Sequence, residues 1–274
     1  MWHADLLSTS TSIGTAMGTG TRSPETAMRY ARLRRFNLVV GLLHLVQGVV
    51  LLALANDLTL PVLATFLADD PVQQQQAMPE LVFELPIAVL VAVFIFFAAG
   101  DHLLVASPRI REWYERKLDE RENYARWIEY SISSSIMIVL IAAFVGIWDL
   151  AAVVAIFAVN TSMILFGLLW ERAEKPGKGA DWSAFWYGTF AGAVPWVIIA
   201  YYVVAAGGEV PGFVYAIVGF QLVLFWSFAL NMALQYAQIG RWRDYIFGEY
   251  AYIILSLAAK TLLAWLIFAN VLRT

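Results

Sequence analysis

Seven long apolar segments run along the chain, and they limit its possible folds more than any other feature. They cover approximately residues 36–56, 84–106, 127–147, 149–170, 185–205, 211–235 and 250–271. Each is close to the ~20 residues that an α-helix needs to cross the hydrocarbon core of a bilayer. Backbone in lipid must satisfy its own hydrogen bonds, and barrel strands are about half as long. The segments therefore predict an all-α membrane protein, a rhodopsin-like bundle of seven transmembrane helices.

The composition supports this class and excludes others. Hydrophobic residues make up 61% of the chain and charged residues only 14%, whereas soluble domains are about half apolar and about a quarter charged. A net charge of −3 gives no electrostatic reason to expect nucleic-acid binding. The chain has no cysteine, so disulfides, thiolate metal sites and cysteine nucleophiles are excluded. We predict a membrane protein that is not an enzyme.

The parts of the chain outside the spans are a tail and a long loop. Residues 1–27 are rich in Ser, Thr and Gly and lack the pattern of a signal peptide, which predicts a disordered tail before a membrane domain at 28–274. The loop at 57–82 is longer than a simple connector. Its alternation of Thr59, Pro61 and Phe66 with polar residues allows a short hairpin, and an irregular polar loop is the alternative.

Basic residues concentrate on one side of the predicted bundle. That side collects Arg29, Arg32, Arg34, Arg35, Arg109, Arg111, Arg116, Lys117, Arg121, Arg126, Arg172, Lys175, Lys178, Arg241 and Arg243. The loops of the other side carry acidic residues, and their one basic residue is Arg273, near the C-terminus. Because loops rich in Lys and Arg stay in the cytoplasm, we expect a cell-membrane protein with its N-terminus inside and its C-terminus outside.

Lys260 is the one lysine of four that falls inside a span, in the middle of YIILSLAAKTLLAWLIF. An ionisable group within the membrane is costly and indicates a functional site. A desolvated lysine amine is suited to forming an imine with a carbonyl compound. The alternative interpretation is a lysine that forms a salt bridge inside a transporter.

A protonated imine on Lys260 needs an anionic partner, and three acidic residues lie in or at the spans: Asp101, Glu129 and Glu249. Glu249 is explained more simply as an acid in the first turn of the last helix, where the helix dipole favours it. Ser256 lies one turn before Lys260 on the same helical face, close enough to hydrogen-bond to its nitrogen.

Further residues complete a candidate site in the predicted bundle. The face that follows Glu129 carries Ser133 and Met137, at four and eight residues beyond it. The aromatic residues Trp196, Phe220 and Trp226 are suited to lining a slot for a flat polyene. Ordinary core packing and the interfacial aromatic belt are the alternative explanation for these rings.

Polar residues on the first two spans predict a second cluster. His44 and Gln47 lie on or near one face of the first span, and Asp101 and His102 lie on the second. Because buried polar groups in lipid seek each other, we expect a water-linked network that also reaches Glu129. The histidines lack the spacing of a metal site, so we predict none.

Several long motifs resemble those of the heliorhodopsins. They are, in chain order, GLLHLVQGVVLLALAND, RWIEYSISSSIMIVLIA, VNTSMILFG, VPGFVYAI and YIILSLAAK, and the resemblance runs from about Phe36 to the end of the chain. It implies all-trans retinal bound as a protonated Schiff base to Lys260 with Glu129 as its counterion. It also assigns Ser256, His44 and His102 to the site, places the N-terminus inside, and implies a homodimer in which the first outer loop forms a small sheet.

The chain also departs from the pattern of proton-pumping rhodopsins. Such pumps carry carboxylates on the third helix eleven residues apart, whereas Glu129 is followed by Ser133 at +4 and Leu140 at +11. They place an aspartate where this chain has Ser256.

We therefore predict a light sensor that does not pump, whose proton network and charged 2–3 loop (REWYERKLDEREN) respond to light. A cytoplasmic signalling partner would use that loop, although a solvated helical extension with mixed charges is the simpler explanation of the loop. A light-gated proton channel or weak ion transporter, a light-driven enzyme regulator and a transporter without pigment are the alternatives.

Overall fold

The computed structural model describes residues 22–66, 78–177 and 179–273. Most of the predicted tail and the middle of the 57–82 loop lie outside these residues. The helices that match the seven predicted spans are α1 (Pro24–Leu54), α2 (Ile87–Ala106), α4 (Tyr124–Phe144), α5 (Leu150–Ala173), α6 (Ser183–Ala205), α7 (Gly212–Tyr236) and α8 (Tyr245–Ile267). Each is long and apolar enough to cross a membrane. The predicted all-α bundle is confirmed.

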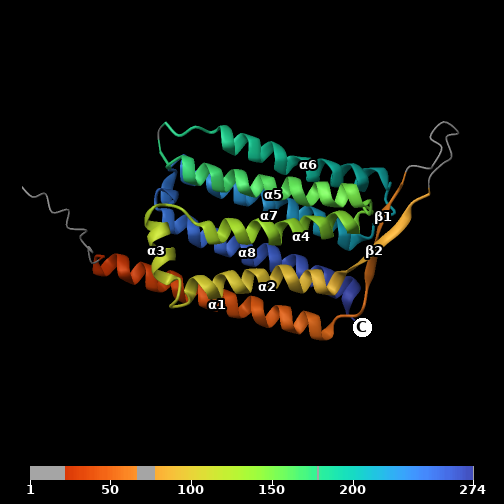
Figure 1. The fold of residues 1–274 in the computed structure, drawn as a ribbon, viewed down its shortest axis with the longest axis horizontal. Coiled ribbons are helices and arrows are strands. Elements are labelled where there is room, and N and C mark those ends of the chain that lie inside the picture. The colour runs from red at the N-terminus through yellow and green to blue at the C-terminus, as the bar shows by residue number, and fades with distance from the viewer. Residues whose placement is uncertain (1–21, 67–77, 178, 274) are drawn as a thin grey trace, which may run out of the picture.

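Short elements mark the two ends of the bundle (Figure 1). One end carries α3 (Arg111–Asp119) and the 3₁₀-helix η1 (Gly240–Arg243), and we call it the α3 end. The other carries the antiparallel strands β1 (Thr59–Ala64) and β2 (Glu80–Pro86), and we call it the hairpin end. A π-helical turn, η2 (Phe268–Leu272), follows α8 at the hairpin end.

Four helices begin before their predicted apolar segments, and α1 and α8 do so by the widest margins. α1 starts at Pro24, after Ser23, whose side chain accepts a hydrogen bond from the Thr26 amide. Residues 24–27 of the predicted tail are therefore helical, and the arginines from Arg29 to Arg35 lie within α1 rather than before it. α8 starts at Tyr245, with Asp244 as its N-cap. The cap residues set these starts, whereas hydropathy marks only the apolar part of a helix.

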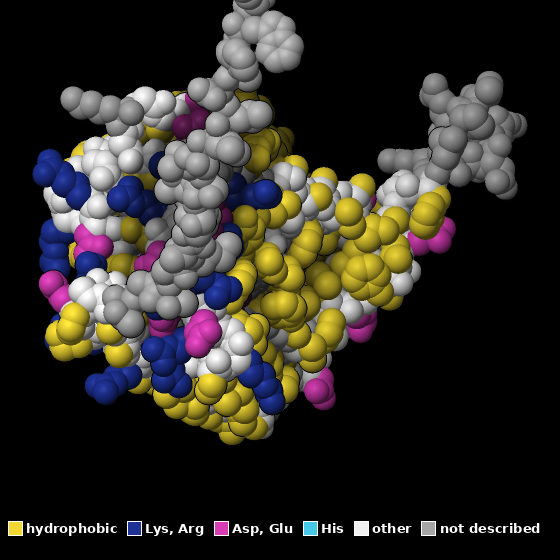
Figure 2. Space-filling view, turned by 60° about the vertical axis from the view of Figure 1, so that its left-hand side comes forward, with side chains coloured by type: hydrophobic (Ala, Val, Ile, Leu, Met, Phe, Trp, Pro, Cys, Tyr) yellow, Lys and Arg dark blue, Asp and Glu magenta, His cyan; other side chains and the backbone are white. Residues whose placement is uncertain are grey.

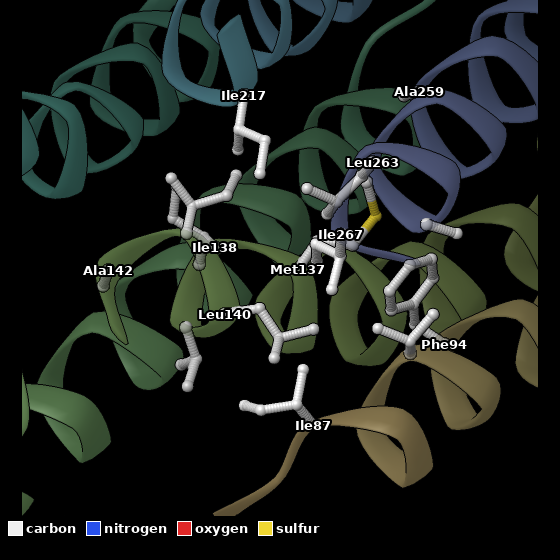
Figure 3. Packing of buried hydrophobic residues seen from close by; sticks show 14 of the residues in the cluster. Ile87, Phe94, Met137, Ile138, Leu140, Ala142, Ile217, Ala259, Leu263 and Ile267 are labelled. Atoms are coloured by element: carbon white, nitrogen blue, oxygen red, sulfur yellow. The ribbon is translucent and has the colours of Figure 1, made fainter. Parts of the chain in front are cut away.

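α4 is the central helix of the bundle, with fourteen of its 21 residues buried between its neighbours. Around it, α1, α2 and α8 lie side by side, as do α5 and α6 (Figure 1). Figure 3 shows Met137 of α4 packed against Leu263 and Ile267 of α8, with Phe94 of α2 close by. Because lipid tails are as apolar as these side chains, close packing holds such helices together in a bilayer.

Glycines allow α1 and α2 to approach closely. A Cβ atom at Gly41 would lie 2.9 Å from Leu103 Cγ, and one at Gly48 would overlap the ring of Phe96. Small residues at a helix interface permit such close backbone contact in membranes. This contact brings the polar faces of the two helices together.

The hairpin is fixed to the ends of the helices that surround it. Thr59 pairs with Pro86 and Val62 with Phe83, and the register shifts between Val62 and Leu63. Val62 is fully buried, and the Leu63 amide donates to the Trp148 carbonyl at 2.8 Å. The 57–82 segment therefore contains a short sheet, whose second strand extends to Pro86.

Charged side chains gather at the α3 end, while the flank of the bundle is apolar (Figure 2). Helix α3 is held there by contacts to α1 and to Arg22, two residues before α1. Arg22 pairs with Glu115, and the Tyr30 hydroxyl donates to Asp119 at 2.5 Å. Arg29 pairs with Asp244 next to α8. The charged 2–3 loop is therefore a helix packed on the bundle, with Tyr114 buried beneath it.

Candidate functional site

Lys260 and Glu129 form a buried ion pair in the middle of the bundle. Lys260 Nζ lies 3.2 Å from Glu129 Oε2 and donates to Ser256 Oγ at 2.7 Å. Lys260 is 3% exposed and Glu129 5% exposed. Lys260 and Ser256 are neighbours because they lie one turn apart on α8, while Glu129 reaches them from α4. The structure brings together the three residues that the sequence places around the imine.

The pair has spare hydrogen-bonding capacity. Glu129 Oε1 and Ser133 Oγ are both buried and have no hydrogen-bond partner among the described residues. Buried polar atoms in proteins are nearly always hydrogen-bonded. The carboxylate is thus placed to accept a further bond while it faces the Lys260 nitrogen.

An apolar cavity adjoins this pair. It holds about 720 Å³ of empty space, counting its opening, and lies among α4, α5, α6, α7 and α8. Its walls are largely aromatic and include Trp127, Tyr130, Trp170, Phe185, Trp196, Phe225, Trp226, Phe228 and Tyr252. The ring of Tyr130 has its centroid 4.9 Å from Lys260 Nζ, so the cavity wall touches the amine. Flat apolar ligands bind in cavities of this kind.

The structure separates the residues predicted to line a polyene slot. Trp196 and Trp226 line the cavity, and Trp196 packs edge-on against Phe225 with 5.4 Å between ring centroids. Phe220 is 56% exposed and does not line it, because it lies on the outer face of α7. Met137 is buried in the apolar core between α4 and α8 (Figure 3).

The two membrane histidines lie next to each other. The rings of His44 and His102 are 6.0 Å apart between centroids and nearly parallel, at 5°. His102 Nδ1 lies 2.7 Å from Asn37 Oδ1, whereas neither nitrogen of His44 has a partner within the described part of the chain. Sequence reasoning missed Asn37, although it lies on the same face of α1 as His44, seven residues earlier.

The other members of the predicted polar network are less closely placed. Gln47 is partly buried, and its Oε1 atom lacks a partner in the described residues. Asp101 is partly exposed on α2, while the ion pair with Lys260 belongs to Glu129. Of the acids weighed as counterions, Glu129 is the one in contact with the lysine. No group of three or more His, Asp or Glu among the described residues is arranged to hold a metal ion.

A second buried charge cluster lies nearer the α3 end. Arg126 pairs with Glu171 of α5 at 2.6 Å and with Glu249 of α8, and all three side chains are buried. Trp127 and Tyr245 donate to Glu171 at 2.5 and 2.9 Å. Buried charges need such pairing and hydrogen bonding. The cluster therefore joins three helices.

This cluster corrects two predictions. Arg126 is wrong as a loop residue, because it lies inside α4 and is 4% exposed. Glu249 is wrong as a first-turn acid, because it is the fifth residue of α8 and is bound by Arg126 and Asn123. Glu171 was missed. A glutamate at the end of an apolar span reads as a surface residue until the packing of the helices is known.

The fold and the buried lysine define a class, the seven-helix membrane proteins of the microbial rhodopsin type. The crystal structure of a light-driven proton pump, LR (Mac), from Leptosphaeria maculans matches with a TM-score of 0.61. It is 14% identical and covers 91% of this chain and 97% of that chain. At this identity the likeness establishes the fold alone.

The family is given by the sequence. The heliorhodopsin family model matches residues 33–272, and the chain belongs to the heliorhodopsin family. No curated protein matches it. The chain is thus a multi-pass membrane protein among the light-sensing rhodopsins, which are not enzymes, and the family implies a retinal chromophore.

Proposed function

We propose that this protein is a light sensor that binds all-trans retinal on Lys260, with Glu129 as the counterion. The observation that carries the proposal is the buried pair of Lys260 and Glu129, which touches an aromatic cavity through Tyr130. A cation and an anion buried together at the edge of an apolar cavity suit a ligand that is apolar along its length and charged where it joins the lysine.

The residues present fit this chromophore. The cavity walls are largely apolar and aromatic, and the unpartnered Oε1 of Glu129 provides a second acceptor beside the lysine nitrogen. Retinal, when bound, supplies a polyene that absorbs visible light and isomerises in response. Ser256 Oγ accepts a hydrogen bond from the nitrogen, and Glu129 balances its charge. Both orient the Lys260 nitrogen before light arrives.

We infer that the histidine pair forms the proton network. His44 and His102 are buried, stacked and near the same polar faces of α1 and α2. A proton that leaves the Lys260 nitrogen needs an acceptor, and imidazole is the side chain whose unperturbed proton affinity best suits reversible transfer near neutral pH. Gln47 and Asp101 lie on the same two helices and belong to the proposed network.

The path expected of a pump is interrupted. Leu140, eleven residues after Glu129, is fully buried in an apolar cluster, and Ser133 lies between them. A proton donor at that depth would need an ionisable side chain, and leucine has none. We therefore propose a slow conformational photocycle that signals without net transport. Photocurrent from voltage-clamped cells measures this directly: a sustained light-driven current would favour a channel or pump instead.

We further propose that the α3 end is cytoplasmic and that the protein dimerises through its extracellular hairpin end. The α3 end holds exposed Lys and Arg side chains (Figure 2), as the positive-inside rule requires of a cytoplasmic face. The outer strand β2 exposes Leu81, Val82 and Phe83, which suit contact with a second copy. Helix α3 and its loop form the surface available to a cytoplasmic signalling partner.

The test of the chromophore is an absorbance spectrum of protein expressed with all-trans retinal, before and after hydroxylamine in the light. We expect a visible band that bleaches to the retinal oxime. Lys260→Ala should abolish the band. Lys260→Arg is the matched control, because it keeps the positive charge but cannot form an imine. A visible band that survives in either variant contradicts the assignment of Lys260.

A further inference from the structure

Asn37 is a buried amide between the two polar helices, and its hydrogen bonds define its orientation. It lies on α1 and is 2% exposed. Its Nδ2 donates to the Leu33 carbonyl at 3.0 Å, and its Oδ1 lies 2.7 Å from His102 Nδ1. The side chain is therefore held at both ends, by its own helix and by α2.

The two contacts determine which atom of Asn37 faces which neighbour. A backbone carbonyl only accepts hydrogen bonds, so the amino group of Asn37 must face Leu33. The amide oxygen then faces the imidazole, and an amide oxygen also only accepts. His102 Nδ1 must therefore carry the hydrogen in this bond.

A neutral imidazole carries one hydrogen, on one of its two nitrogens. If Nδ1 of His102 is the donor, then Nε2 holds the lone pair. The hydrogen bond at one ring nitrogen generally determines the state of the other. We propose that Asn37 is a positioning residue that holds neutral His102 in the Nδ1–H tautomer and so makes Nε2 the atom that accepts a proton.

The packing of α1 on α2 favours the same arrangement. A Cβ atom at Gly41 would lie 3.1 Å from His102 Cβ, so a larger residue there would press against His102. Gly41 lies one turn beyond Asn37, and His44 follows with its ring stacked on that of His102. Asn37, Gly41 and His44 thus hold the His102 ring in place along one face of α1.

This inference rests on the proposed function only in giving His102 a role in proton transfer. The tautomer itself is a property of the protein with or without retinal. It is therefore measurable even if the chromophore assignment fails.

The test is ¹⁵N NMR of histidine-labelled full-length protein at pH 8, with and without retinal. The chain has three histidines, and the His102 signals are those lost in His102→Gln. We expect His102 Nδ1 to give a protonated-nitrogen shift and Nε2 a lone-pair shift. Asn37→Leu, which removes the acceptor but keeps the size, should shift the ring towards Nε2–H. Asn37→Asp keeps an acceptor oxygen and should retain Nδ1–H.

A second readout separates tautomer control from simple structural support. In the pigment, Asn37→Leu should slow light-driven deprotonation of the Lys260 nitrogen by about tenfold or more. About tenfold is the smaller effect seen when a metal-binding histidine loses the hydrogen-bond partner that orients it. Its dark absorption band should stay in place, because the Lys260–Glu129 pair is untouched. Flash photolysis measures the first, and the spectrum shows that the variant folds.

Three results would overturn the proposal: an Nε2–H or doubly protonated His102 in the unsubstituted protein, an unchanged tautomer in Asn37→Leu, or an unchanged deprotonation rate in a variant whose tautomer has shifted. Failure to form any pigment would instead refute the proposed function, and the NMR result would still stand on its own.

Discussion

Glu129 presents two different oxygens to the centre of the bundle. Oε2 faces Lys260 at 3.2 Å, and Oε1 has no partner among the residues described. With an effective dielectric constant of ~20, the Coulomb attraction across 3.2 Å is on the order of 5 kcal/mol. That attraction stabilises a positive charge located on the nitrogen in the dark.

Glu129→Gln should therefore move the visible band to longer wavelength. Light shifts positive charge away from the nitrogen, so a nearby anion stabilises the ground state more than the excited state. Removing the anion therefore lowers the energy difference between the two states. Asp101→Asn is the control and should leave the band nearly in place, since Asp101 does not contact the lysine in the ion pair. If Asp101→Asn gives the larger shift, Glu129 is not the main counterion. The measurement is the absorption maximum of each purified pigment.

The Arg126 cluster makes a prediction about stability. Arg126 lies between two buried carboxylates, Glu171 and Glu249, and pairs with both. Its removal leaves two like charges buried without a cation, a loss of about 3–5 kcal/mol. Arg126→Gln should lower the temperature at which the pigment loses its band more than Glu171→Gln does, because the latter keeps one matched pair. Equal losses in both variants would show that the charges act independently.

At the residue scale, the sequence predicted the proximity of Lys260, Ser256 and Glu129 but not the Arg126 cluster. Lys260 is conspicuous as a lysine in an apolar span, and Ser256 follows from helical spacing alone. Arg126 and Glu171 are separated by 45 residues and lie near the ends of spans, where charge is ordinary. Asn37 was missed because a lone asparagine in a helix gives no signal until its partner on α2 is known.

At the scale of elements, α5 and α6 owe part of their cavity wall to glycine. Gly192 lies on α6, and a Cβ atom there would overlap the Met163 sulfur of α5, which also lines the cavity. Methionine is flexible and adapts its packing. A larger residue at Gly192 would therefore push Met163 into the cavity rather than separate the helices.

Gly192→Leu should reduce the yield of pigment severalfold after addition of retinal, while the protein still reaches the membrane. Adding Met163→Ala should restore part of the yield, because it returns volume to the cavity. Gly219→Leu on α7 is the matched control, since no atom lies within 4 Å of a Cβ built there. Full yield in Gly192→Leu would mean that retinal does not use this part of the cavity.

The helices themselves were predictable because apolar runs of membrane-spanning length leave few alternatives. Their ends were less so. The part of α1 before its apolar run carries Arg29, Arg32, Arg34 and Arg35. Hydropathy reads these residues as loop, although the Ser23 cap and Pro24 start a helix. Helix α3 is amphipathic and rests on buried Tyr114 and Leu118, which a count of charges does not reveal.

At the scale of the whole molecule, the two ends of the bundle differ in charge. Arginines and lysines surround the α3 end, while the hairpin end exposes apolar and acidic residues (Figure 2). Seven spans place the described ends of the chain on opposite sides of the membrane. The orientation of the bundle in the membrane can therefore be measured with a reporter fused to one end of the chain.

The reporter is one that works only outside the cytoplasm, and it is fused after Thr274. We expect it to be active. The physical reason is the cost of moving the basic α3 end across the membrane. The control carries the same reporter in the α3 loop after Arg121, where it should be inactive. An active reporter in the α3 loop with a silent one at the C-terminus would reverse the orientation.

The attachment of α8 at the hairpin end has a mechanical consequence. Beyond Lys260, the helix runs into η2, whose Val271 and Leu272 carbonyls accept hydrogen bonds from Asn56 at 2.9 and 2.8 Å. Asn56 in turn precedes the strand that is bonded to the loop before α5. The helix that bears the lysine is thus anchored at its hairpin end and would pivot about that end. Because Tyr245 lies further from the anchored end than Lys260 does, a small displacement of Lys260 would give a larger displacement at Tyr245, beside α3.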